Sequence, residues 1–104
     1  MHLVDTVEVE PEQVDHYLEV VRTLGLPVMI DAGASFVSCG TTSKLIGERV
    51  WVQVVWAFAN HEQWNEIRRQ LVLDPRWYEY GARLASLRVG GTRRFYSPAS
   101  ISSS

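Results

Sequence analysis

The chain has 104 residues, of which 46% are hydrophobic and 21% charged, with a formal net charge of −2 at pH 7. This length predicts one domain, and the small negative charge argues against a nucleic-acid partner. No apolar run reaches the roughly 18 residues of a membrane span, and the N-terminus lacks a signal-peptide pattern, so we expect a cytoplasmic protein without a membrane partner.

The spacing of apolar residues predicts four strands and two helical regions. We expect Gly25 and Pro27 to end the first helix, and Gly90-Gly91 to break the chain before the last strand. Residues 28–33 fit either an apolar loop or an extra turn. In chain order, the expected elements are a strand at 3–9, a helix at 11–24, strands at 35–41 and 49–58, a helix from 61 that restarts or kinks at Asp74-Pro75, and a strand at 92–97.

The segment from Trp51 to Trp77 holds all four tryptophans and the clearest helix-start signals. Asn60, with Gln63 three residues later, matches a capping box, and Asp74 before a proline is a further cap. A small domain with so many indoles around one strand and helix builds either a packed core or an aromatic-walled pocket.

The order β-α-β-β-α-β predicts an α+β ferredoxin-like fold. In that fold the first and third strands lie in the middle of a four-stranded antiparallel sheet, the fourth strand lies beside the first, and the helices cover one face. The bare face would carry Trp51 or Trp56, so we expect a second copy of the chain to cover it as a homodimer. We expect one domain over residues 1–98 and a disordered tail over residues 99–104.

Charge is unevenly distributed along the chain. Residues 1–19 hold six acidic residues and no Lys or Arg, whereas residues 75–104 hold five arginines against Glu79 alone. One interpretation is an anion-binding surface near the C-terminus. The interpretation we favour is that the two ends of the chain lie side by side and neutralise each other.

Part of the second half resembles a known family. The residues are the run Val55-Trp56-Ala57-Phe58-Ala59-Asn60, then Trp64, Arg68-Arg69, Leu71 and Asp74-Pro75-Arg76-Trp77, and they resemble NIPSNAP-type proteins. The resemblance implies a dimeric α/β barrel in which each sheet forms half of the barrel, the partner is a second copy, and pockets lie between sheet and helices or inside the barrel. Small antibiotic-biosynthesis monooxygenases, EthD-like proteins and polyketide cyclases share this superfamily. Some members bind haem, but nothing in this sequence requires a cofactor or metal.

The resemblance covers residues 50–98 well, and the first half by topology only. The first strand here contains His2-Leu3-Val4-Asp5-Thr6 in place of the Tyr-Glu-Leu-Arg-like motif common in the family. The motif is therefore informative about the fold and says little about the reaction.

Two polar residues in the expected central strands are candidate functional groups. Asp5 lies mid-strand, where Asp is disfavoured, and in an apolar cavity it would suit a general acid or base. The simpler interpretation is an ion pair with Arg93 or Arg94. Gln53 would orient a ligand, satisfy a buried backbone group or lie at the dimer seam. If the first and third strands pair, Asp5 and Gln53 are near neighbours.

The other candidates are one histidine and several aromatic residues. His16 is a second possible acid or base, because imidazole titrates near neutral pH, although a solvated or partly packed surface histidine is the interpretation we favour. Most aromatics at these spacings belong to a core, and Trp51 shares a strand face with Gln53. The candidate pocket walls are Trp51, Trp56, Tyr17, Trp77 and Tyr80.

We therefore expect a cofactor-independent enzyme acting by acid/base chemistry and positioning on a small hydrophobic, polyketide- or terpenoid-like molecule, such as an isomerase, cyclase or lyase. One alternative is a non-catalytic ligand-binding or scaffold protein. The other is a cofactor-free monooxygenase that uses the carbanion of its substrate and O₂.

Overall fold

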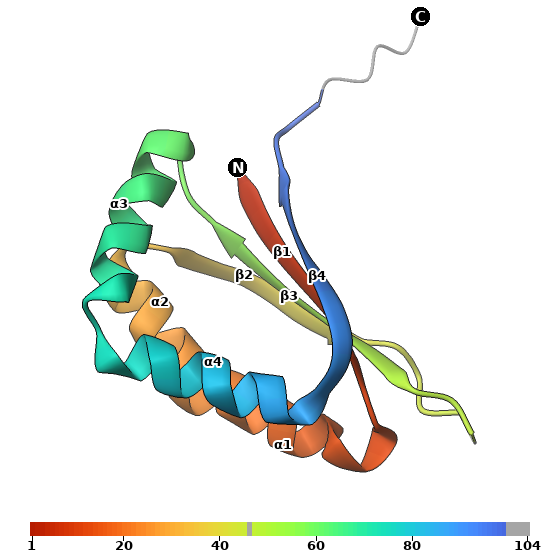
Figure 1. The fold of residues 1–104 in the computed structure, drawn as a ribbon. Coiled ribbons are helices and arrows are strands. Elements are labelled where there is room, and N and C mark those ends of the chain that lie inside the picture. The colour runs from red at the N-terminus through yellow and green to blue at the C-terminus, as the bar shows by residue number, and fades with distance from the viewer. Residues whose placement is uncertain (46, 100–104) are drawn as a thin grey trace, which may run out of the picture.

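The computed structural model describes residues 1–45 and 47–99. It contains one four-stranded antiparallel sheet with the helices packed on one face (Figure 1). This is the predicted α+β ferredoxin-like fold, with β1 and β3 in the middle of the order β2-β3-β1-β4. The strands are β1 (His2–Val9), β2 (Ser35–Thr41), β3 (Val50–Ala57) and β4 (Arg88–Tyr96).

The core lies between the sheet and the helices. Alternate residues of the central strands point toward the helices, because successive side chains of a strand face opposite sides. Trp56 is one of them: it is buried and packs against Phe36 of β2 with ring centroids 5.6 Å apart. The buried residues of β1 and β3 on this face are Leu3, Val7, Val9, Val50, Val52, Val54 and Trp56.

The first helical region is longer than predicted, because Gly25 and Pro27 do not end it. A π-helical turn precedes Pro27, which stands in the first turn of α2, a position that tolerates proline. The region ends instead at Gly33, whose φ of 111° is left-handed. Its parts are a 3₁₀ turn (Pro11–Gln13), α1 (Val14–Val20), the π-turn (Val21–Gly25) and α2 (Leu26–Ala32).

Both predicted caps of the second helical region are confirmed. Asn60 accepts a hydrogen bond from the Gln63 backbone N–H at 2.9 Å, and the Gln63 side chain accepts one from Ala59. Asp74 accepts one from the Arg76 N–H at 2.9 Å. These caps start α3 (His61–Val72) and α4 (Pro75–Leu87).

The last strand begins four residues earlier than predicted. Gly90 and Gly91 lie within β4 and do not break the chain. A Cβ on Gly91 would lie 2.7 Å from Val7 Cγ1 and 2.8 Å from the Thr6 carbonyl oxygen, so glycine is needed for β4 to approach β1. Residues 100–104 of the expected tail lie outside the described residues.

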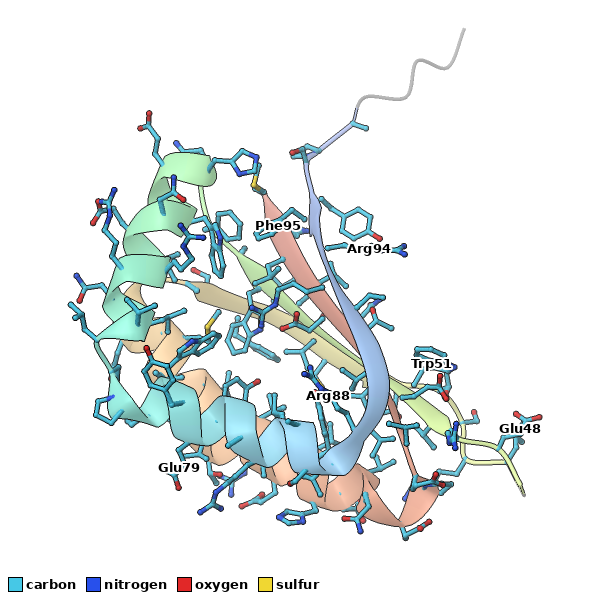
Figure 2. The ribbon with its side chains drawn as sticks, in the orientation of Figure 1. Glu48, Trp51, Glu79, Arg88, Arg94 and Phe95 are labelled. Atoms are coloured by element: carbon cyan, nitrogen blue, oxygen red, sulfur yellow. The ribbon has the colours of Figure 1, made fainter. Side chains whose placement is uncertain are left out.

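Within the described residues, no helix covers the second face of the sheet (Figure 1). Trp51 and Arg94 lie on this side, whereas Phe95 points toward the helices (Figure 2). Trp51 is 44% exposed within one chain. We refer to this surface, which includes Trp51, Gln53 and Arg94, as the open face.

Candidate functional site

A cavity of about 400 Å³ lies between the β1–β4 side of the sheet and helices α1 and α4. Gly81 of α4 helps to make this space, because a Cβ added there would meet no atom within 4 Å. The cavity mixes aromatic walls with charged groups, as small-molecule sites do. Its lining residues are Asp5, Val7, Tyr17, Trp77, Tyr80, Gly81, Leu84, Arg88, Gly91, Thr92 and Arg93.

Asp5 and Arg93 form an ion pair at the cavity. They are register partners on β1 and β4. Arg93 donates from Nε to Asp5 Oδ1 at 2.7 Å and from Nη2 to Oδ2 at 3.2 Å. The two side chains are 18% and 42% exposed, so solvent reaches the pair. The ion-pair interpretation of Asp5 is confirmed for Arg93.

Arg93 also lies over the ring of Trp77, with its guanidinium carbon 5.8 Å from the ring centroid. Such a contact attracts the cation to the aromatic face. Burial lowers the pKa of Arg93, but the hydrogen bond and the charge of Asp5 outweigh that effect and leave it raised. Arg93 is thus a fixed positive charge that pairs with the Asp5 carboxylate and lies over the indole of Trp77.

Two tyrosines supply neutral donors to the cavity. Burial, followed by the charge of Asp5, raises the pKa of Tyr17 to about 12. Burial likewise raises the pKa of Tyr80, with the nearby Tyr17 and Asp5 adding to it. Among residues 1–45 and 47–99, neither phenol oxygen forms a hydrogen bond. Every side-chain polar atom that is fully enclosed in this part of the chain does have a hydrogen-bond partner. Both hydroxyls therefore reach accessible space and remain protonated at neutral pH.

Arg88 is the third charged residue of the cavity lining. Its register partner Val9 is buried on the helix side of the sheet, and Figure 2 shows the Arg88 side chain between β4 and the helices. Within the described part of the chain, Arg88 forms no ion pair with a carboxylate. With Asp5 neutralised by Arg93, the cavity carries one surplus positive charge.

The structure brings four of the proposed residues to one place. Asp5 comes from β1, Tyr17 from α1, and Trp77 and Tyr80 from α4. The rings of Trp77 and Tyr80 lie 6.1 Å apart and form one wall.

The other four proposed residues lie elsewhere. Trp51 and Gln53 are exposed on the open face, whereas Trp56 is buried in the core. His16 is exposed on α1, because the neighbouring Tyr17 takes the direction that faces the sheet.

The expectation that Asp5 and Gln53 share a site is wrong. Gln53 is the register partner of Thr6, whereas Asp5 pairs with Val54. Adjacent strand positions point to opposite faces, so the carboxylate and the amide lie on either side of the sheet.

Sequence reasoning missed Arg88 as a site residue and treated Arg93 only as a partner for Asp5. Alternation in β4 was the available signal for Arg93, because residues 91, 93 and 95 fall on the face of Asp5 when the strand is extended back through Gly90-Gly91. The same alternation places Arg88 on the opposite face. Arg88 reaches the cavity side through the register shift between Glu8 and Val9, which no local sequence pattern indicated.

Metal and membrane features receive no support from the described residues. No group of three His, Cys, Asp or Glu side chains among residues 1–45 and 47–99 could hold a metal ion. None of the three histidines lines the cavity. Among the described helices, none is long and apolar enough to cross a membrane.

Comparisons with known structures support the fold. A NIPSNAP domain protein from Burkholderia xenovorans is 21% identical over 100% of both chains, with a TM-score of 0.79. A NIPSNAP family protein from Agrobacterium tumefaciens is 23% identical over 98% of this chain and 97% of that chain, with a TM-score of 0.72. A Caulobacter crescentus protein provisionally named an antibiotic biosynthesis monooxygenase is 15% identical over 95% of this chain and 89% of that chain, with a TM-score of 0.65.

At these identities the likeness establishes the fold alone. A search of curated proteins found no match. The model of the NIPSNAP family, however, matches residues 4–103, nearly the whole chain. On this match, the chain belongs to the NIPSNAP family.

Proposed function

We propose that this protein is a cofactor-independent enzyme that moves protons on a small hydrophobic molecule held between the sheet and the helices. The observation that carries the proposal is the meeting of Asp5 with the neutral phenols of Tyr17 and Tyr80 around one cavity. An isomerase, cyclase or lyase acting next to a carbonyl group would use this combination. The volume of about 400 Å³ falls within the usual range for small-molecule sites.

In this proposal Asp5 acts as the general base and removes a proton from carbon beside the carbonyl. The electron pair moves into the carbonyl oxygen, where Tyr17 or Tyr80 donates a hydrogen bond to the developing negative charge. The proton returns from Asp5 to another carbon of the same molecule. Arg93 acts as a positioning residue, because its two hydrogen bonds fix the orientation of the carboxylate.

A homodimer is also part of the proposal. A second copy on the open face would cover Trp51, which is 44% exposed. It would also cover Gln53 and join two sheets into a barrel. The cavity lined by Asp5 lies on the opposite, helix side, so both protomers would retain a site.

The second candidate is a cofactor-free monooxygenase. It is favoured by the structural likeness to the Caulobacter crescentus protein provisionally named an antibiotic biosynthesis monooxygenase. The first step is the same proton removal by Asp5, after which the substrate carbanion reacts with O₂. Both candidates therefore exchange deuterium, and consumption of O₂ together with the substrate separates them.

Deuterium exchange tests the proposal directly. The protein is incubated in D₂O with a panel of cyclic β-diketones and unsaturated cyclic ketones, and deuterium uptake is followed by NMR in air and under nitrogen. We expect uptake in both atmospheres, and a loss of about 100-fold or more in Asp5→Asn. Asp15→Asn, an exposed carboxylate on α1, is the matched control. Exchange that survives Asp5→Asn within tenfold would remove Asp5 from the mechanism.

A further inference from the structure

We propose that Arg88 binds the carboxylate of a monoanionic ligand whose apolar part lies against Trp77 and Tyr80. This inference rests on the proposed function, because it names the substrate class of the same cavity. The inference goes beyond the proposed function, because it makes a negative charge on the ligand a requirement for tight binding.

The charge balance of the cavity is the first argument. On β1, Asp5 is the acidic lining residue, and on β4, Arg88 and Arg93 are the basic ones. The α1 helix contributes Tyr17 without a charge. On α4, Glu79 pairs with Arg83 at 2.9 Å and lies on the outer side of the helix (Figure 2). One ligand charge of −1 would therefore neutralise the lining.

The placement of Arg88 is the second argument. The residue stands where α4 ends and β4 begins, and its backbone N–H caps the helix by donating to the Leu84 carbonyl. A cation near a helix C-terminus is favourable, which explains the charge without a ligand. A favourable charge at the end of the helix does not explain why the Arg88 side chain lines the cavity together with Tyr17.

The remaining lining specifies the rest of the ligand. Trp77 and Tyr80 form an aromatic wall, and Leu84 adds an apolar surface. The protonated hydroxyls of Tyr17 and Tyr80 can donate to oxygen. A flat, unsaturated monocarboxylate satisfies these groups together, whereas a doubly charged phosphate exceeds the one surplus positive charge.

Calorimetric titration with two matched probes tests the inference. The probes are a naphthalene carboxylate and the corresponding naphthalene carboxamide, which share their shape but differ in charge. We expect the carboxylate to bind about tenfold tighter or more, because a charge-assisted pair with arginine is stronger than a neutral hydrogen bond. In Arg88→Gln this preference should fall to near equality, while carboxamide binding stays within about threefold.

Three variants complete the design. Arg94→Gln removes a charge from the same strand on the open face and should leave the preference unchanged. Arg88→Lys should restore part of it. Gly81→Phe should fill the cavity and abolish binding of both probes, and thermal unfolding confirms that each variant is folded.

Each contrary result has a defined meaning. Equal binding of both probes to the natural protein overturns the inference, as does a preference that survives Arg88→Gln. Binding that survives Gly81→Phe lies outside the cavity and also overturns it. If neither probe binds, the carboxylate assignment is wrong, and the Asp5-dependent deuterium exchange decides independently whether the proposed function stands.

Discussion

The phenol ring of Tyr80 rests on the backbone of Gly25. A Cβ on Gly25 would lie 2.7 Å from Tyr80 Cζ and 2.8 Å from its hydroxyl oxygen. Gly25 belongs to the π-turn of the first helical region, and Tyr80 is 4% exposed on α4. The contact holds α4 against that region and sets the position of one hydroxyl in the cavity.

Two glycine substitutions should therefore act in opposite directions. Gly25→Ala should lower the free energy of unfolding by about 1–3 kcal/mol, because the methyl group overpacks a rigid ring. Gly81→Ala, on α4 with open space at its Cβ, should raise it by about 0.5–1 kcal/mol through helix propensity. Urea unfolding of both variants measures the two changes in the free energy of unfolding. If Gly25→Ala leaves that free energy unchanged, the Tyr80 ring moves away from the added methyl group without cost.

The ionisation of Tyr17 should make the protein less stable in alkali. Its folded-state pKa of about 12 lies above the ordinary value of 10.0, so folding favours the protonated phenol. The resulting stability is fully present below pH 10.0 and is lost as the pH rises toward about 12. The loss is up to about 2–3 kcal/mol, from roughly 1.4 kcal/mol per pKa unit.

Tyr17→Phe isolates this contribution, because phenylalanine keeps the ring and cannot ionise. Urea midpoints measured across that alkaline range should fall less steeply in the variant than in the natural protein. Parallel curves for the two proteins would mean that the Tyr17 phenol is as easily ionised in the folded chain as in the unfolded one.

The ion pair between Asp5 and Arg93 should contribute a measurable coupling energy. A double-mutant cycle of Asp5→Asn and Arg93→Gln should give about 1 kcal/mol, the upper end for a solvent-accessible pair, because two hydrogen bonds orient it. The pair Glu79–Arg83 on α4, with both side chains about half exposed, is the control and should give about 0.3–0.5 kcal/mol. Equal couplings would show that the cross-strand geometry adds nothing.

Local signals predicted much of the fold. The caps at Asn60 and Asp74 were readable because each depends on a few neighbouring residues. The glycines were misread for the opposite reason. Gly25 and Gly91 have neighbours distant in sequence, namely the Tyr80 ring and β1, so the same residue type that usually ends an element marks a close approach here.

The sequence indicated only part of the residues around the cavity, and it did not indicate their arrangement. Asp5, Tyr17, Trp77 and Tyr80 meet at one cavity, whereas Gln53 lies across the sheet. A sequence shows which residues alternate along a strand, but not which alternating set the helices cover when both sets contain aromatic residues. That choice depends on packing over the whole sheet.

The proposed dimer predicts a difference between two exposed apolar residues. Trp51 lies on the open face, whereas Leu73 is 79% exposed where α3 ends, in the helix layer. Trp51→Glu should convert a dimer into a monomer in sedimentation velocity, because a charge would be buried without a partner. Leu73→Glu should leave the dimer intact. The reverse pattern would place the interface on the helices, and a monomeric natural protein would remove the barrel altogether.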